Sequence, residues 1–164
     1  MLFFLLFVLM EFTNVKCTSF DKEFTEFEYC YLKSVNRSYK YLSLKCNLLQ
    51  APVTKIKVNV AFFKRFSGYR PFMYNVTVDF CRFLKNPSSN AFVNFWYRMV
   101  VDYSNINHTC PYNRDIRVEK LPIGVVNFQM TEVLPFPEGD YLIESTWIAY
   151  DIKRVEVKFY GSLF

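Results

Sequence analysis

Residues 56–62 read Ile-Lys-Val-Asn-Val-Ala-Phe, so the apolar side chains at positions 56, 58, 60 and 62 share one face of an extended chain. Lys57 and Asn59 fall on the opposite face. A period of two with one apolar and one polar face is typical of a β-strand that is buried on one side only. Such strands form antiparallel rather than parallel sheets, because parallel strands are covered on both faces.

Outward from this stretch, the same alternation recurs along the chain, with turn signals between the segments at residues 36–38, 51–52, 67–68 and 137–140. Several short alternating strands with this spacing predict an all-β protein, a sandwich or a barrel. Aromatic residues make up 20% of the sequence, which suits either a β-rich core or the wall of a large apolar cavity. The further apolar faces are Leu42, Leu44, Cys46 and Leu48; Val76, Val78 and Phe80; and Val155, Val157 and Phe159.

One segment breaks the alternation and predicts an inserted helix at about residues 89–102. Between Ser88 and Tyr103 the apolar residues recur three and four positions apart, which is the helical period. Pro87 precedes the segment, and Ser88, Ser89 or Asn90 can cap it. Two interpretations stay open: the helix packs on the sandwich, or it forms a lid or wall of a ligand pocket. The stripe consists of Phe92, Phe95, Trp96, Met99, Val100 and Tyr103.

The first ten residues, Met-Leu-Phe-Phe-Leu-Leu-Phe-Val-Leu-Met, resemble the apolar core of a secretory signal peptide. We expect a signal peptide over residues 1–16, cleaved between residues 11 and 17, and a single domain over residues 17–164. The alternatives are a buried strand or an anchor. A membrane span needs about 20 apolar residues, and this run stops at Glu11, so we expect no integral membrane span.

Three glycosylation triplets agree with a secreted, extracellular protein. They begin at Asn36, Asn75 and Asn107, and none has proline in the middle. Asn36 falls in a turn signal, and Asn75 falls on the polar face of its strand. We therefore expect all three asparagines to be exposed and to carry glycans.

The five cysteines predict disulfides rather than a metal or redox site. The sequence has no Cys-x-x-Cys pair and only one histidine. In an oxidising compartment cysteines pair, and spacing alone does not decide the pairing. Cys81 and Cys110 flank the predicted helix, so we expect a bridge that pins both its ends. Cys46 lies on an apolar face among leucines and is the candidate for the unpaired cysteine.

Catalytic and nucleic-acid functions find little support in the sequence. His108 is the middle residue of a glycosylation triplet, where a glycan crowds any active site. Nucleophile elbows, zinc-binding helices and phosphate-binding glycine loops are absent from the sequence. The net charge of +5 comes from scattered basic residues, so we expect no nucleic-acid partner. We predict that the protein is not an enzyme and uses no metal or other cofactor.

Five blocks of sequence are spread over nearly the whole predicted domain: residues 12–17, 27–37, 74–79, 105–112 and 134–141, in which the last is Leu134-Pro135 followed by Pro137-Glu138-Gly139-Asp140-Tyr141. These blocks resemble a large family of small secreted insect proteins of unknown function. That family is related to the ML lipid-recognition domain superfamily, which includes innate-immune lipopolysaccharide co-receptors and lysosomal sterol carriers. Some insect members are linked to chemosensory tissue.

The resemblance implies an immunoglobulin-like, two-sheet antiparallel sandwich whose sheets part to hold a lipid. It also implies four recurrent cysteines, which match Cys17, Cys30, Cys81 and Cys110, and Cys46 stands where the family usually has an aliphatic residue. We therefore expect Cys17–Cys30 as the second bridge, with Cys46 able to replace either partner.

The prediction for function is a secreted protein that binds a hydrophobic small molecule between two β-sheets: a lipid, sterol, fatty acid or pheromone-like ligand. The resemblance makes a chemosensory or innate-immune role and a cell-surface receptor part of this expectation. The alternative is an extracellular protein-interaction module with a solid core, and a large apolar cavity between the sheets separates the two. The candidate lining residues are Phe62, Val76, Val78, Phe80, Phe95, Trp96, Phe128, Trp147 and Phe159.

Overall fold

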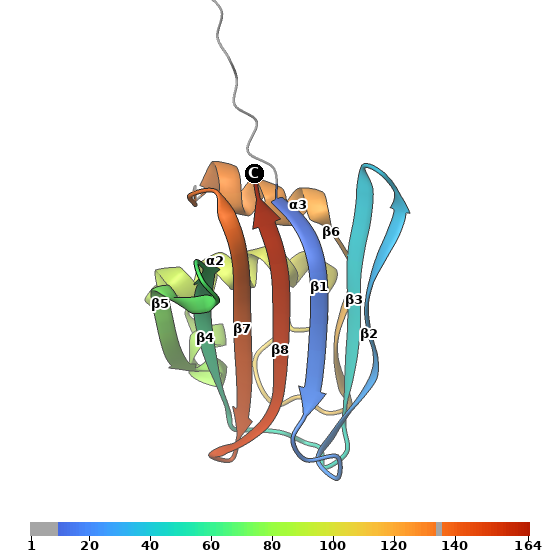
Figure 1. The fold of residues 1–164 in the computed structure, drawn as a ribbon. Coiled ribbons are helices and arrows are strands. Elements are labelled where there is room, and N and C mark those ends of the chain that lie inside the picture. The colour runs from blue at the N-terminus through green and yellow to red at the C-terminus, as the bar shows by residue number, and fades with distance from the viewer. Residues whose placement is uncertain (1–9, 134–135) are drawn as a thin grey trace, which may run out of the picture.

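The computed structural model describes residues 10–133 and 136–164 as a two-sheet antiparallel sandwich with short helices (Figure 1). One sheet has five strands in the order β1-β8-β7-β4-β5, and the other has three in the order β2-β3-β6. The strands are β1 (Met10–Ser19), β2 (Thr25–Asn36), β3 (Tyr39–Leu48), β4 (Ile56–Arg65), β5 (Tyr69–Asp79), β6 (Asp115–Pro122), β7 (Gly139–Ala149) and β8 (Ile152–Leu163).

This architecture confirms the predicted all-β sandwich and the predicted inserted helix. The helical elements are α1 (Phe80–Lys85), a 3-10 turn (Pro87–Ser89), α2 (Ala91–Val100), a 3-10 turn (Val101–Tyr103), α3 (Ile123–Phe128) and a π-helical turn (Gln129–Val133). None of the helices in the described part of the chain is both long and apolar enough to cross a membrane.

The sequence pattern misses α1 and α3, and it extends one strand too far. Each of these helices has six residues, too few for a helical period to show. The assignment of Phe80 to a strand is wrong, because the Asp79 side chain accepts a hydrogen bond from the Arg82 N–H at 3.1 Å and caps α1 there. Asn90 caps α2 in the same way, accepting from the Val93 N–H at 3.0 Å.

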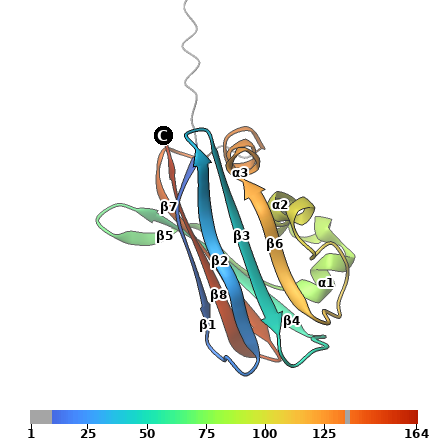
Figure 2. The same ribbon diagram turned by 90° about the vertical axis from the view of Figure 1, so that its right-hand side faces the viewer.

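The two sheets meet along one long side and part along the other. On the closed side a disulfide joins Cys17 on β1 to Cys30 on β2. On the open side α1 and α2 lie beside β6 (Figure 2), and a disulfide joins Cys81 of α1 to Cys110 in the loop before β6. Both predicted pairings are confirmed, and Cys46 is free and buried as predicted.

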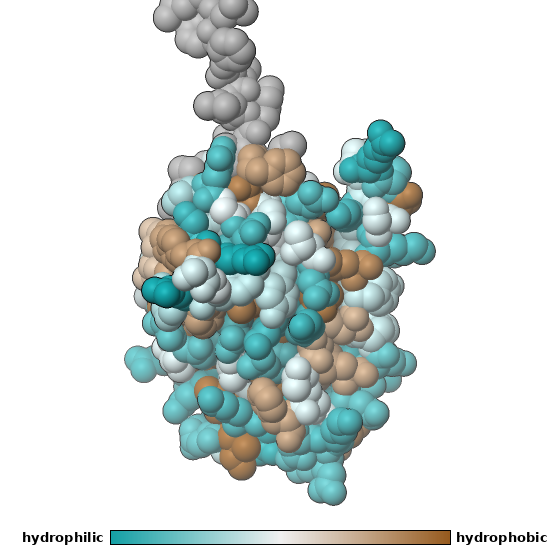
Figure 3. Space-filling view, in the orientation of Figure 1, coloured by the Kyte–Doolittle hydropathy of each residue, from teal (hydrophilic) through white to brown (hydrophobic). Residues whose placement is uncertain are grey.

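The strand faces follow the alternation in the sequence. On β5, Val76 and Val78 turn toward the core, whereas Asn75 and Thr77 are exposed. The outer side of the five-stranded sheet is mainly hydrophilic with scattered apolar side chains (Figure 3). The asparagines of all three glycosylation triplets, Asn36, Asn75 and Asn107, are exposed.

Strand β5 is a free edge with two irregularities. Pro71 lies within it, and Met73 adopts a left-handed backbone conformation with φ of 63°. The pairing register with β4 shifts across the same segment, between Ala61 and Phe63. The β4–β5 hairpin projects from the body of the sandwich (Figure 2).

Strand β1 begins seven residues before the expected start of the domain at Cys17. From Met10 onward it pairs with β8, and the side chains of Met10 and Phe12 are buried. Residues 1–9 of the expected signal peptide lie outside the described residues, as does the Leu134-Pro135 pair of the last resembling block.

Candidate functional site

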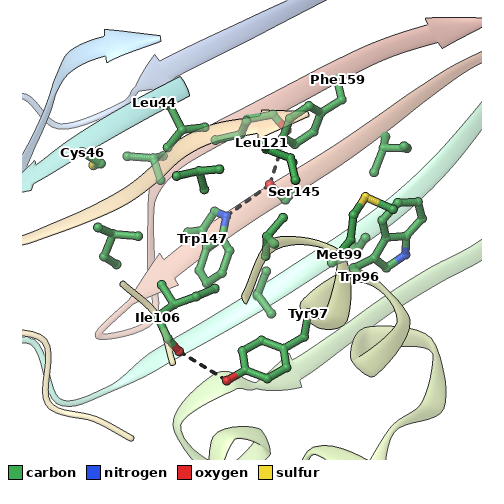
Figure 4. A pocket seen from close by; sticks show the side chains of 18 of the residues that line it. Leu44, Cys46, Trp96, Tyr97, Met99, Ile106, Leu121, Ser145, Trp147 and Phe159 are labelled. Carbon is green, nitrogen blue, oxygen red and sulfur yellow. Dashed lines mark hydrogen bonds between the residues drawn. The ribbon is translucent and has the colours of Figure 1, made fainter. Parts of the chain in front are cut away.

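An apolar cavity of about 170 Å³ lies between the two sheets (Figure 4). Its wall comes from strands of both sheets, from α2, and from single residues of α1, α3 and the loop before β6. The lining residues are Met10, Phe12, Phe27, Leu44, Cys46, Val58, Val60, Phe80, Val93, Trp96, Tyr97, Met99, Val100, Ile106, Ile116, Val118, Leu121, Val126, Ile143, Ser145, Trp147, Val155, Val157 and Phe159.

The strands place their wall residues by the period of two. On β7 the inward positions are Ile143, Ser145 and Trp147, and on β8 they are Val155, Val157 and Phe159. Ser145 and Trp147 are only partly buried although they face between the sheets. This remaining exposure of inward side chains is what a cavity, rather than a filled core, produces.

Helix α2 closes the open side of the sandwich over the cavity. Its residues Val93, Trp96, Tyr97 and Val100 follow the helical spacing and line the wall together with Met99. The other aromatic residues of the helix face elsewhere: Phe92 stacks on Tyr74 of β5 at 4.2 Å, and Phe95 packs near Phe136. The lid interpretation of the helix is therefore consistent with its position.

The wall contains few polar groups and no charged side chain. The indole N–H of Trp147 donates to Ser145 Oγ at 3.2 Å, and the Tyr97 hydroxyl donates to the Ile106 carbonyl at 3.5 Å (Figure 4). Among the 24 residues that line the cavity there is no Asp, Glu, Lys, Arg or His. An apolar wall with a few placed polar groups is typical of a site for a small organic ligand.

Two further wall residues, Trp96 and Cys46, carry polar atoms. The Trp96 nitrogen is buried without a hydrogen-bond partner among the described residues, where the ring packs against Phe62 and Phe95. Burial raises the pKa of the Cys46 thiol to about 12, so the thiol is protonated at neutral pH and is a poor nucleophile.

Four of the nine predicted lining residues are on the wall: Phe80, Trp96, Trp147 and Phe159. The other five are elsewhere. Phe62 is fully buried and Phe95 is buried, and both pack against Trp96 in the solid core beside the cavity. Val76 and Val78 face the core from β5 outside the wall. Phe128, at the end of α3, is 57% exposed.

The alternation identifies the inward faces of several wall residues that were not predicted as ligand contacts, such as Val58, Val60, Val155 and Val157. The alternation does not predict Ser145 as a wall residue, because a serine interrupts the apolar face of the strand. Val93 and Tyr97 lie outside the stripe predicted for the helix. α2 is apolar on most of its circumference, so the period alone does not select the face toward the cavity.

A second, polar hollow of about 350 Å³ lies at the surface near His108. Lys45, Arg114 and Arg117 contribute positive charge, and Asp115 lies 3.6 Å from Arg117. The His108 ring packs against Tyr112 at 4.6 Å. Within residues 10–133 and 136–164, no three His, Cys, Asp or Glu side chains come close enough together to hold a metal ion.

Comparison with known families gives a match over about half of the chain. A profile of the family described as "Protein of unknown function (DUF1091)" matches residues 58–143. This segment runs from β4 to β7 and includes α2 and the Cys81–Cys110 bridge, but it ends just before Ser145 and Trp147. No curated protein matches the chain.

Proposed function

This chain belongs to the DUF1091 family of proteins of unknown function, and from its cavity we propose that it is a secreted binding protein for a hydrophobic small molecule. The ligand lies between the two β-sheets, under α2. The single observation that carries this proposal is an uncharged cavity of about 170 Å³ in a sandwich of ordinary size. Close-packed protein interiors have few voids larger than a water molecule.

The size of the cavity favours the smallest of the expected ligands. An engineered apolar cavity of about 150 Å³ in another protein stays dry and binds benzene. Sites for drug-sized ligands measure about 300–1,000 Å³. A compact ring or a short aliphatic chain therefore fits the cavity as it stands, whereas a sterol or a long fatty acid requires α2 to move outward. Within the expected range we propose a compact, pheromone-like ligand.

Three features support the secreted part of the proposal. Two disulfides are typical of an oxidising compartment. All three asparagines in glycosylation triplets are exposed. The resemblance to secreted insect proteins and to the ML lipid-recognition superfamily points the same way, and it supports a chemosensory or innate-immune role with a cell-surface receptor as partner.

Intrinsic fluorescence provides a direct test, because both tryptophans of the chain, Trp96 and Trp147, line the cavity. Titration with compact apolar ligands such as cyclohexane or short-chain esters is expected to shift the emission to saturation. Calorimetry then gives the affinity without relying on the tryptophans.

A matched pair of substitutions locates the binding. Leu121 lines the cavity and Leu42 does not, although the two residues are cross-strand partners on β6 and β3. Leu121→Trp fills the cavity, so we expect at least a tenfold loss of affinity with little change in stability. Leu42→Trp forces an indole into solid core, and we expect a loss of about 1–3 kcal/mol or more in unfolding free energy.

The rival function, an extracellular interaction module with a solid core, makes the opposite predictions. In that case no compact apolar ligand binds to the wild type, and both tryptophan variants lose similar amounts of stability. That combination of results would count against the carrier and in favour of the module.

A further inference from the structure

Ser145 is an exception on the inner face of β7. Its neighbours on that face, Ile143 and Trp147, are apolar, and it lies in the wall of the cavity. A hydroxyl in an apolar wall without good hydrogen bonds is energetically unfavourable. Alanine or valine at this position would complete the apolar face. The serine hydroxyl therefore needs a hydrogen-bond partner.

The hydrogen bonds of Ser145 leave its own proton weakly engaged. Its oxygen accepts from the Trp147 indole N–H at 3.2 Å, which fixes the side chain in the wall (Figure 4). Its only acceptor among the described residues is the Val157 carbonyl at 3.4 Å. The usual O–H···O distance is about 2.7–2.8 Å, so this hydrogen bond is long and weak.

The other hydroxyl of the wall, that of Tyr97, points to a different part of the chain. Tyr97 points toward the Ile106 carbonyl, away from Ser145 (Figure 4). That carbonyl also accepts from the Tyr112 hydroxyl at 3.3 Å, so Tyr97 belongs to a small network that anchors the loop before β6. Of the two hydroxyls in the wall, that of Ser145 is therefore the one that a ligand can engage without displacing Tyr97 from this network.

The wall also restricts the charge of the ligand. It contains no basic side chain to pair with a carboxylate and no acidic side chain to pair with an amine. An unpaired ion in such surroundings costs far more than a neutral polar group. A ligand enclosed in this cavity must be neutral.

We propose that the ligand is an uncharged molecule with one hydrogen-bond acceptor, an oxygen of a ketone, ester, aldehyde or alcohol, which the Ser145 hydroxyl binds while Trp147 holds that hydroxyl in place. This inference rests on the proposed function and adds the chemical class of the ligand. The apolar remainder of the molecule fills the space under α2. Carboxylates and amines are excluded from the cavity.

Three isosteric probes test the class: α-methylstyrene without an oxygen, acetophenone with a carbonyl, and benzoate with a charge. Calorimetry is performed on the wild type, on Ser145→Ala, and on Ser145→Thr, which keeps the hydroxyl. Thr146→Val is the matched control, because Thr146 is the adjacent residue on the opposite face of β7. Thermal unfolding of each variant verifies that it folds.

We expect Ser145→Ala to weaken acetophenone binding about threefold to tenfold, as loss of one hydrogen bond does, and to change α-methylstyrene binding less than about twofold. Ser145→Thr restores acetophenone binding, Thr146→Val leaves both affinities unchanged, and benzoate does not bind. Equal effects of Ser145→Ala on both neutral probes, or no effect on either, would overturn the role of Ser145 while leaving the proposed function intact. Benzoate binding comparable to that of acetophenone would overturn the neutral class, and failure of all three probes on the wild type would overturn the proposed function as well.

Discussion

The thiol of Cys46 is buried in the cavity wall, and only 5% of the residue is exposed. The residue lies among leucines on an alternating face of β3 and forms no disulfide. Burial raises the pKa of the thiol to about 12, from an ordinary value near 9. The pKa rises because the thiolate is the charged form of the side chain, and an apolar site disfavours a charge.

Alkylation with iodoacetamide tests this assignment. At pH 8 the thiolate fraction of Cys46 in the folded protein is expected to be about a thousandfold lower than in the unfolded chain, so labelling is slower by at least that factor. The rate in the folded protein rises about tenfold per pH unit from pH 8 to 10, whereas in the urea-unfolded chain it levels off above about pH 9. Mass spectrometry at each pH measures both rates.

The other four cysteines are bridged, so the same experiment contains its own control. Labelling at any of those four positions in the folded, oxidised protein would contradict the pairing. Fast labelling of Cys46 in the folded state would contradict its burial.

Two asparagines, one at the N-cap of α2 and one within the helix, provide a second test at the scale of single residues. Asn90 caps the helix, and its replacement by alanine is expected to cost about 1 kcal/mol in unfolding free energy. The Asn94 side-chain oxygen is buried without a partner among the described residues. Asn94→Ala removes an unsatisfied group and introduces the best helix former, so we expect it to be neutral or stabilising.

Urea denaturation of Asn90→Ala and Asn94→Ala side by side measures this difference. Similar losses for both variants would contradict the assignment of Asn90 as the cap.

At the scale of elements, the inserted helix and the strands could be predicted because each has a clear period. The cavity could not be predicted in the same way. Val58 and Phe62 lie on the same inward face of β4, yet Val58 lines the cavity and Phe62 is packed in solid core. The period of two says which face a side chain occupies, but not whether another side chain or a void lies opposite.

The disulfide on the open side of the sandwich is expected to contribute more stability than the one on the closed side. Cys81–Cys110 closes a loop of 29 residues and Cys17–Cys30 one of 13. In the chain-entropy model these bridges contribute about 3.6 and 2.9 kcal/mol, respectively. Double alanine substitutions, measured by urea denaturation, compare them directly.

Hydrogen exchange separates the local effects of the two bridges. Loss of Cys81–Cys110 is expected to increase exchange in α1 and α2, because the bridge ties α1 to the loop before β6. Loss of Cys17–Cys30 is expected to act at β1 and β2 instead. Unchanged protection of α2 after removal of Cys81–Cys110 would contradict the role of that bridge in holding α1 and α2 in place.

The burial of residues at the start of β1 leads to a prediction about cleavage of the expected signal peptide. Cleavage between residues 11 and 17 would remove from two to seven of the ten residues of β1, including the buried side chain of Met10 and, past residue 12, that of Phe12. Burial of each such side chain is worth about 1.5–3 kcal/mol. A chain that begins at Cys17 is therefore expected to lose several kcal/mol relative to one that begins at Met10, measured by urea denaturation.

N-terminal sequencing of protein recovered from the medium of cells that express the full chain decides how much of β1 remains. Equal stability of the two chains would show that Met10 and Phe12 do not belong to the core.

At the scale of the whole molecule, the three glycosylation triplets are spread over separate parts of the surface. Asn36 lies at the end of β2, Asn75 on the outer face of β5, and Asn107 in the loop before β6. None of the three is among the residues that line the cavity. We expect glycans at all three sites in secreted protein, seen as a fall in mass after treatment with an amide-cleaving glycosidase.

Replacement of each asparagine by glutamine is expected to remove one glycan and to leave binding of apolar ligands unchanged. A variant at Asn75 that keeps the mass of the wild type would contradict occupancy of that site.

The irregular edge of β5 has a consequence for self-association. An exposed sheet edge is a template onto which a strand of another copy can add, and this is a common route to fibrous aggregates. At β5 the template is interrupted, since Pro71 offers no N–H and Met73 turns the backbone into a left-handed conformation. We therefore expect this edge to resist the addition of strands from other copies of the chain, even at high protein concentration.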